Sequence, residues 1–328
     1  MRRRSLLIAC AAIPIAGPAR AQADRPVIGM IYGSPNTAPL VIKPFLDGMR
    51  ALGWAEGNKF ILDHRAIGDV SRTAERVREL QQRPVAVLVT LTTGIALEAH
   101  RAAPLLPIVM MSSGYPVESK LGLAESYARP GGMVTGFTLF AGTEIYGKHV
   151  QLLMEARPGL RNLVALWDQI SEDGELAIRE MEAAAQRLGV DLQVLRIRHE
   201  SDLKAALDSL DGQKMDALIV TSGSIHPLPA NLVRLKNFVD QRRLLVLTDL
   251  HSNIWRQGIA TLVQGANLPD IARQTAWYVD RILKGAKPGD LPIERPSKFD
   301  LAVNLALARQ LGFEIPKSIT ARATEVID

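Results

Sequence analysis

Short apolar runs alternate with amphipathic stretches along the chain from Pro26 onward, and this alternation limits the folds that the chain can adopt. The runs VIGMIY (27–32), VAVLVT (85–90) and PIVMMSS (107–113) are apolar on successive residues instead of on every second residue. Strands of that kind are buried on both faces, which is typical of a parallel sheet covered by helices on each side. The pattern therefore predicts a doubly wound α/β architecture.

The same pattern occurs twice along the 328 residues, a length that suits one large or two medium domains. The first set of strands is expected at 27–32, 59–65, 85–90, 107–113 and 133–140. The second set is expected at 162–167, 191–197, 216–222, 244–249 and 259–264, and a long helix at about 267–284 and an extended segment at 297–304 follow. We therefore expect two Rossmann-like doubly wound lobes joined by hinge strands. One larger doubly wound domain and two independent domains are the alternatives.

The stretch ARPGGMVTGFTLF (128–140) lies where the first set of strands gives way to the second. Pro130 keeps Arg129 out of the helical region, and Gly131 and Gly132 allow backbone angles that other residues resist. We expect this turn and the strand after it to carry the chain from one lobe to the other. The predicted lobes are residues 24–139 with 265–296, and residues 140–264 with 297–328.

The first 21 residues have the features of an export signal. MRRRS is a positive n-region, residues 6–17 form an apolar run of signal-peptide length, and Ala19-Arg20-Ala21 matches an A-x-A cleavage site. A membrane-spanning helix needs about 20 apolar residues, so this run is too short to be an anchor. We expect residues 1–21 to be a signal peptide and the mature chain to be periplasmic. Arg3-Arg4 leaves both a twin-arginine signal and a Sec signal open.

Removal of this segment changes what the charge and the cysteine count imply. Four of the 39 basic residues lie in residues 1–21, so 35 remain against 34 acidic residues and the net charge falls from +5 to +1. A chain this close to neutral lacks the basic excess of a nucleic-acid-binding protein. The only cysteine, Cys10, also lies in this segment, which leaves no disulfide and no cysteine metal site in the mature chain.

Common enzyme signatures do not occur in the sequence. It has no G-x-S-x-G, no P-loop and no H-E-x-x-H motif, and GSPNTAP after the first strand lacks the glycines of a dinucleotide-binding turn. The six histidines are scattered, without an i,i+4 pair that could prearrange a metal ion. We therefore expect no catalytic residues, no metal and no cofactor.

Small polar and aromatic residues gather where the predicted strands end. Ligands of open α/β sheets bind outside the carboxyl ends of the strands, so these residues are the candidate ligand-binding set. They are Tyr32, Ser34, Thr92, Thr93, Ser112, Tyr115, Trp167, Asp168, Ser222 and Asp249. The same residue types also cap helices and form turns, which is the alternative interpretation for each of them.

Different members of this set suit different parts of a ligand. Thr92 and Thr93 open a helix, where hydroxyls and free backbone N–H groups can bind a carboxylate. Trp167 and Tyr115 could stack on a ring. Asp168 and Asp249 could each bind an ammonium group, with helix capping as the alternative.

Several stretches resemble one family of ABC-transporter substrate-binding proteins, which includes the tryptophan/tyrosine-type proteins. LAESYARPGGMVTGF (123–137) resembles that family's L-A-R-P-G-G-N-[IV]-T-G segment, and residues 278–316, YVDRILKGAKPGDLPIERPSKFDLAVNLALARQLGFEIP, are similar to its C-terminal run. FLDGMRALGWAEGNKFILDHR (45–65) resembles its G-L-x-x-L-G-Y-x-E-G-x-N segment. The resemblance extends in order over residues 27–328.

The resemblance implies a type I periplasmic binding fold that encloses a small molecule, such as an amino acid or a related carboxylate, and delivers it to a membrane permease. A monomer without catalysis is expected, and a ligand sensor for a membrane receptor or an exported α/β enzyme are the alternatives. This chain has Tyr115-Pro116 where many members have Asp-Pro, Trp167-Asp168-Gln169 where they have Trp-Asn-Pro, and Met133 in place of asparagine. The first two departures lie at candidate ligand-binding positions. The resemblance therefore indicates the fold, but it leaves open whether the ligand is an α-amino acid.

Overall fold

The computed structural model describes most of the chain after the predicted signal peptide. The described residues are 25–114, 116–117, 122–138, 144–168, 174–221, 225–226, 228–250, 253–296 and 299–328. The predicted signal peptide, residues 1–21, lies outside them. Among the described residues, no helix has both the length and the apolar character needed to cross a membrane.

The first sheet has five strands, all parallel, in the spatial order β2-β1-β3-β4-β5. They are β1 (Val27–Tyr32), β2 (Ile61–Ala66), β3 (Val85–Thr90), β4 (Ile108–Ser113) and β5 (Val134–Thr138). Every residue of β1 and of β5 is buried, as expected of strands that are covered on both faces.

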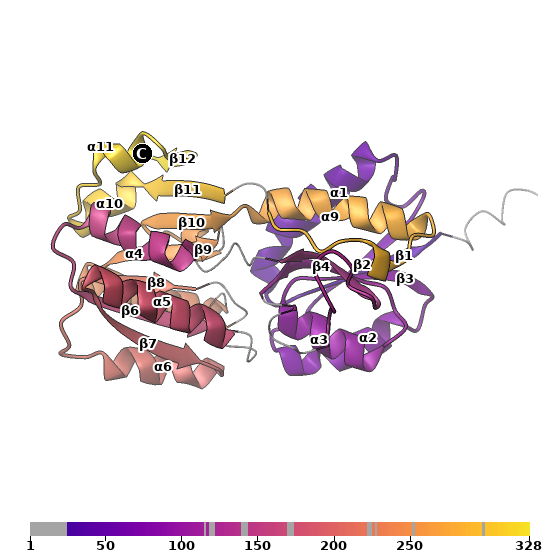
Figure 1. Ribbon diagram of the computed structural model, residues 1–328, viewed down its shortest axis with the longest axis horizontal. Coiled ribbons are helices and arrows are strands. Elements are labelled where there is room, and N and C mark those ends of the chain that lie inside the picture. Colours follow the sequence, from indigo (N-terminus) through magenta and orange to yellow (C-terminus); the bar gives the residue numbers. More distant parts are fainter. Residues whose placement is uncertain are drawn as a thin grey trace, which may run out of the picture.

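Helices cover both faces of this sheet (Figure 1). On one face, α1 (Ala38–Ala51) and α9 (Leu268–Leu283) pack together over a core that includes Phe45, Phe137 and Tyr278. On the other face, α2 (Thr73–Leu80) and α3 (Thr93–Ala102) cover a second core. Three short 3₁₀ turns complete this lobe: η1 (Pro35–Thr37), η2 (Val70–Arg72) and η3 (Pro288–Asp290).

The second sheet has seven strands in the order β12-β11-β10-β9-β8-β6-β7. They are β6 (Asn162–Asp168), β7 (Asp191–Ile197), β8 (Ala217–Val220), β9 (Leu245–Leu250), β10 (Leu262–Ala266), β11 (Phe299–Asn304) and β12 (Glu325–Ile327). All neighbouring strands are parallel except β10 and β11, which pair antiparallel. The extended segment predicted at 297–304 thus belongs to the second sheet, where its described part forms β11.

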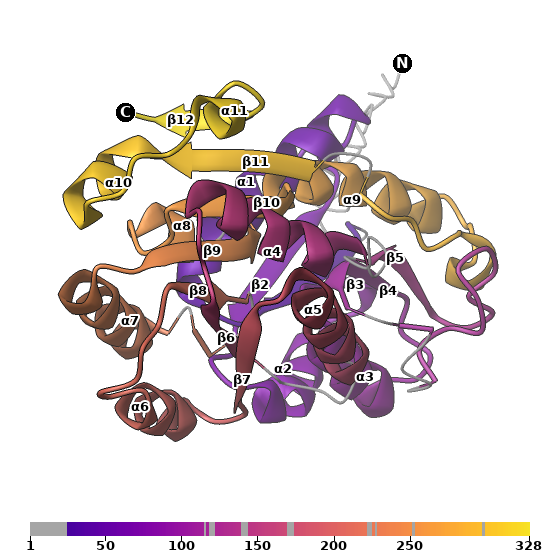
Figure 2. The ribbon, with the colours of Figure 1, turned by 60° about the vertical axis from the view of Figure 1, so that its left-hand side comes forward.

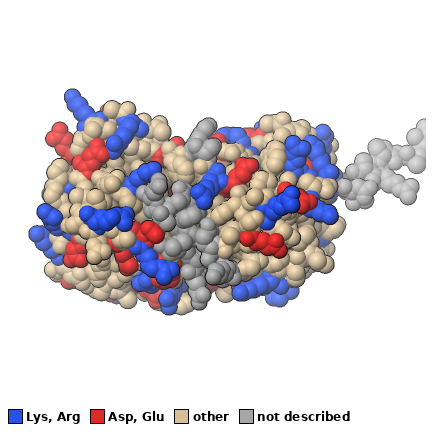
Figure 3. Space-filling view, in the orientation of Figure 1, with Lys and Arg blue, Asp and Glu red and all other residues tan. Residues whose placement is uncertain are grey.

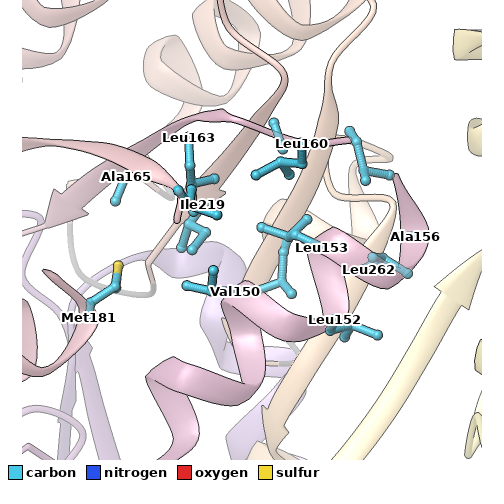
Figure 4. Close-up of a cluster of buried hydrophobic side chains, with 14 of the residues drawn as sticks. Val150, Leu152, Leu153, Ala156, Leu160, Leu163, Ala165, Met181, Ile219 and Leu262 are labelled. Carbon is cyan, nitrogen blue, oxygen red and sulfur yellow. The ribbon is translucent and has the colours of Figure 1, made fainter. Parts of the chain in front are cut away.

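The helices of the second lobe also lie in two layers (Figure 2). In one layer, α4 (Glu144–Ala156) and α5 (Gly174–Leu188) contribute Val150, Leu153 and Met181 to a core against the sheet (Figure 4). In the other, α6 (Glu200–Ser209) and α7 (Pro229–Arg242) cover the opposite face. The shorter helices are α8 (Asn253–Arg256), α10 (Leu305–Leu311) and α11 (Lys317–Thr320).

The predicted architecture of two doubly wound lobes is confirmed, because two mainly parallel sheets each lie between layers of helices. The long helix predicted at about 267–284 is α9, and it returns to the first lobe to pack against α1. The residue boundaries of the two lobes stay a prediction.

Candidate functional site

The carboxyl ends of the five strands of the first sheet and of β6 to β10 in the second sheet face the junction between the lobes, whereas β11 and β12 run the opposite way (Figure 1). Two chain connections require this. β5 ends at Thr138 in the first sheet and the next helix, α4, lies in the second lobe, while β10 ends at Ala266 in the second sheet and leads directly into α9 of the first lobe. The two rims at which α/β sheets bind ligands therefore face one another.

Three segments connect the lobes and together form a hinge. Besides the two connections just described, the chain returns from residues 293–296, beside β5, to β11. Thr138 N donates to Glu294 O at 2.9 Å, and Glu294 N donates to Gly136 O at 2.9 Å, so this segment runs along β5. Asn267 joins the other segments, because its Oδ1 caps α9 at Asp270 N (2.9 Å) and its Nδ2 donates to Asp300 of β11.

On the rim of the first lobe, two threonine hydroxyls hold the backbone that follows β4. Gly114 N donates to Thr93 Oγ1 at 2.7 Å, and Thr138 Oγ1 donates to Gly114 O at 2.6 Å. Thr92 caps α3, with its hydroxyl accepting from Ile95 N at 3.3 Å. Thr93 was predicted from its place at a strand end and Thr138 was not, although the hydroxyl at the end of the fifth strand was a usable signal.

Ser34 and Tyr32 also have structural partners at this rim. Ser34 is 1% exposed, and its hydroxyl accepts from Asn36 N at 3.3 Å at the start of η1. The Tyr32 ring is buried in the core beneath α1, and its hydroxyl lies 2.9 Å from Nδ1 of His64. Burial raises the pKa of Tyr32, against a smaller lowering by the charge of Arg65, so the phenol is neutral. A role of either residue toward a ligand stays a prediction.

On the rim of the second lobe, aromatic rings gather at the end of β6. Trp167 is 8% exposed and faces the layer of α4 and α5. The ring of Tyr146, on α4, lies 6.0 Å from that of Trp167 and 5.8 Å from that of His149, measured between centroids. Trp167 thus belongs to an aromatic group and does not stand alone at the rim.

His149 is the centre of a buried polar group that the sequence did not indicate. Its Nε2 lies 2.7 Å from the backbone oxygen of Gln264, and a carbonyl can only accept, so Nε2 carries the hydrogen and Nδ1 is an acceptor. Nδ1, like Oε1 of Gln264, is buried and has no hydrogen-bond partner in the described part of the chain. Burial lowers the pKa of His149, while the Asp249 carboxylate and then the Gln264 carbonyl oppose this effect. The Asp249 carboxylate of β9 therefore interacts electrostatically with His149.

The remaining predicted residues fall at the limits of the described structure. Ser112 and Asp168 lie at the ends of β4 and β6, and their side chains are outside the described part, as are Tyr115 and Ser222 altogether. The structure thus places Ser34, Thr92 and Thr93 on one rim and Trp167 and Asp249 on the other. Their contact with a ligand stays a prediction.

The comparison with known families is decisive for the class of protein. The model described as ABC transporter substrate binding protein matches residues 36–327, which is most of the chain. The chain belongs to this family. A search among curated proteins found no match.

Solved structures similar to this substrate-binding protein agree on the fold. A conserved domain protein from Vibrio cholerae is 24% identical, with a TM-score of 0.81 over 92% of this chain and 99% of its own. A domain from Streptococcus pneumonia in complex with L-Trp is 20% identical, with a TM-score of 0.81 over 93% and 100%. A ligand-free, open substrate-binding protein with adhesive properties from Clostridium difficile is 18% identical, with a TM-score of 0.65 over 93% and 99%. These likenesses confirm the predicted type I periplasmic binding fold.

Within the described ranges, no group of three or more His, Cys, Asp or Glu side chains could hold a metal ion. On the face shown in Figure 3, Lys and Arg are interspersed with Asp and Glu on both lobes instead of forming a single basic patch. The family is one of substrate-binding proteins and not of enzymes.

Proposed function

We propose that the protein is the periplasmic receptor of an ABC importer, which binds a small molecule between its lobes and delivers it to a membrane permease. The observation that carries the proposal is the orientation of the two sheets, whose ligand-binding rims face a junction spanned by three hinge segments. The family match supports the transport role. The signal-like residues 1–21 support export, and we expect a monomer.

The mechanism that we propose is hinge closure. A molecule that contacts both rims binds the closed form better than the open one and so shifts the population toward closure. A shift from 1:99 to 99:1 requires about 5.5 kcal/mol of differential affinity. A few charge-assisted hydrogen bonds and one stacked ring are enough for this.

The two rims favour a ligand with two unlike ends. The N-terminus of α3 carries hydroxyls and backbone N–H groups, which suit a carboxylate. The second rim carries the Trp167 ring and the Asp249 carboxylate, which suit a ring and an ammonium group. An amino acid, an aromatic acid or a related carboxylate is the proposed ligand class. Relatives with this fold are described with L-Trp and with myo-inositol bound, so the fold alone does not fix the ligand.

A thermal-shift screen of amino acids, aromatic acids and short carboxylates tests this function. A compound that binds only the folded chain stabilises it by about 2.7 kcal/mol at 100 times its Kd, which raises the Tm. Asp249→Asn and Thr93→Ala are then expected to weaken its binding at least about tenfold by calorimetry, since each removes a polar contact of about 1.5–3 kcal/mol.

Matched variants separate ligand contacts from structural effects. Asp211→Asn removes an acid that is 94% exposed and should leave affinity unchanged. Thr93→Ser keeps the hydroxyl that accepts from Gly114 and should retain affinity. Wild-type affinity in both Asp249→Asn and Thr93→Ala would contradict the proposed site.

The sensor alternative differs in its partner and not in its ligand. Genes for a permease and an ATPase beside this one would favour import, and a gene for a histidine kinase or chemoreceptor would favour sensing. Turnover of a bound compound would instead establish an enzyme.

A further inference from the structure

A groove of about 640 Å³ lies at the end of the first lobe that faces away from the second lobe. Its floor includes Ala86 and Pro107, where β3 and β4 begin, and Met133, directly before β5. Because the carboxyl ends of these strands face the junction between the lobes, their amino ends face outward, and the groove lies there (Figure 1). The groove is therefore separate from the candidate site between the lobes.

Two backbone segments form the walls of the groove. One is the turn at Gly131 and Gly132, and the other runs over residues 285–290, just after α9. Gly131 N donates to Gly289 O at 3.2 Å, so the two walls meet. A Cβ on Gly132 or on Gly285 would have no neighbouring heavy atom within 4 Å. The absence of side chains at these two positions therefore keeps the groove open.

Hydrogen bonds beyond the groove hold both walls in place. Thr135 of β5 donates from Oγ1 to Leu291 O at 2.7 Å, and Ile293 N donates to Tyr127 O at 2.7 Å. These bonds join the segment after each wall to a neighbouring part of the first lobe, and they need no ligand. A largely preformed groove of about 300–1,000 Å³ is typical of sites for small molecules. The size and the fixed walls of this groove are therefore those of a binding site.

The lining of the groove combines an apolar surface with two opposite charges. Its apolar side chains include Pro107, Met133 and Ile282. Its charged side chains are those of Lys287 and Asp290, and both residues are exposed. In the part of the chain that the structure describes, neither of these two side chains has a hydrogen-bond or ion-pair partner. A ligand with an apolar body, one anionic group and one cationic group would contact all of these features.

The two charges lie close together because one short turn carries both. Lys287 directly precedes η3 and Asp290 ends it, and Asp290 N donates to Lys287 O at 3.1 Å. The Cα atoms at the two ends of such a turn lie within about 7 Å of each other. The carboxylate and the ammonium group of an α-amino acid are attached to one carbon atom. One amino acid can therefore reach both charges at once.

We propose that this groove is a second binding site, which takes a small zwitterion with an apolar side chain, such as an apolar amino acid. Lys287 binds its carboxylate and Asp290 binds its ammonium group. The apolar side chain of the ligand lies on Pro107, Met133 and Ile282. The inference does not rest on the proposed function, because the groove lies within one lobe and needs no movement of the other.

Methyl NMR of the whole protein tests the site, with L-leucine as the probe. The methyl groups of Met133 and Ile282 report on the groove, and those of Met181 and Ile178, buried in the second lobe, are the controls. We expect L-leucine at about 10 mM, a concentration suited to a small ligand on an open groove, to shift the first pair and not the second. 4-Methylpentanoate lacks the ammonium group and isoamylamine lacks the carboxylate. Each should bind about two- to fivefold more weakly than L-leucine, because it loses one exposed charge pair.

Charge-neutral variants assign the two ends of the ligand. Lys287→Gln should remove the preference for L-leucine over isoamylamine, and Asp290→Asn should remove the preference over 4-methylpentanoate. Lys214→Gln and Asp211→Asn, which alter exposed charges of the second lobe, should retain both preferences. Equal affinity of the unaltered protein for the three compounds overturns the roles of Lys287 and Asp290.

A larger side chain at Gly132 tests the place of the site. The φ of Gly132 lies outside the left-handed region and a Cβ there meets open space, so Gly132→Leu occupies the groove without backbone strain and should abolish the response to L-leucine. Ala205→Leu adds the same side chain at an exposed position of α6 and should retain the response. No shift at Met133 and Ile282 in the unaltered protein, or a full response in Gly132→Leu, overturns the second site. Neither result bears on the ligand between the lobes, which the thermal-shift screen tests.

Discussion

Replacing Gly48 with alanine is expected to destabilise the first lobe by about 2–3 kcal/mol. Gly48 lies on α1 where it meets α9, and a Cβ there would lie 2.2 Å from the backbone oxygen of Arg273 and 2.9 Å from Cβ of Ala276. Backbone atoms cannot rotate away as a side chain can, so α1 and α9 must move apart to accept the Cβ. Such overpacking lowers the free energy of unfolding. The gain in helix propensity, about 1 kcal/mol, is too small to offset this.

Urea denaturation measures this effect, and tryptophans near α1 and α9 report on it. Trp54, just after α1, donates from Nε1 to Asp280 Oδ1 of α9 at 2.8 Å, and Trp277 lies on α9 itself. Gly147→Ala is the matched control, because Gly147 lies in a helix where a Cβ would meet only Cβ of Ala184, at an ordinary 3.6 Å. That variant should be neutral or stabilised by up to about 1 kcal/mol. Equal stabilities for the two variants would contradict the packing of α9 on α1.

Gly136→Ala is expected to have the largest effect, about 3–5 kcal/mol. Gly136 lies within β5 with φ of +122°, a conformation that residues with a side chain rarely adopt. A Cβ there would lie 2.1 Å from the backbone oxygen of Met110 on β4. The substitution therefore adds backbone strain to the separation of two paired strands. Because β5 also pairs with the return segment at Glu294, loosening of the hinge is expected together with the loss of stability.

Gly53→Ala separates the two contributions to that loss. Gly53 follows α1 with φ of +85° and has open space around its Cα, so only backbone strain of about 1–2 kcal/mol is expected. Thermal and urea unfolding of both variants measure the difference. A Gly136→Ala variant no less stable than Gly53→Ala would show that β4 and β5 do not approach as closely as described.

The strand positions were predictable because most of these strands are apolar on both faces. The predicted strands at 27–32 and 85–90 coincide with β1 and β3, since no polar residue interrupts the buried run before it ends. The short helices α8, α10 and α11 and the strand β12 were not predicted. Each has seven residues or fewer, and local periodicity carries little information over so few positions.

The path of the chain from one lobe to the other depends on contacts between segments that are far apart in the sequence. Gly131 N donates to Gly289 O at 3.2 Å, which joins the ARPGG turn to the segment after α9. A Cβ on Gly289 would meet the backbone of Gly131 at 2.8 Å, so these glycines allow two chain segments to touch. The turn was recognisable from the sequence, but its partner was not, because the two are far apart along the chain.

The sequence predicted where the candidate site residues lie, but it predicted only part of what their side chains bind. Hydroxyls at strand ends do lie on the rims, but the hydroxyl of Thr93 binds the backbone of Gly114, which strand order alone could not indicate. His149 and Gln264 were missed because their partnership joins a helix to a strand much later in the sequence. In this protein the sequence pattern indicated which edge of each sheet matters, and tertiary contacts determine which atoms at that edge already have partners.

Small-angle X-ray scattering of the mature protein with and without a compound that raises its Tm tests the central claim most directly. If the two lobes close around a small molecule between their facing rims, saturation with that compound should reduce the radius of gyration and remove the scattering of an open, two-bodied shape. Saturation by calorimetry without any change in the scattering curve would contradict closure around the ligand.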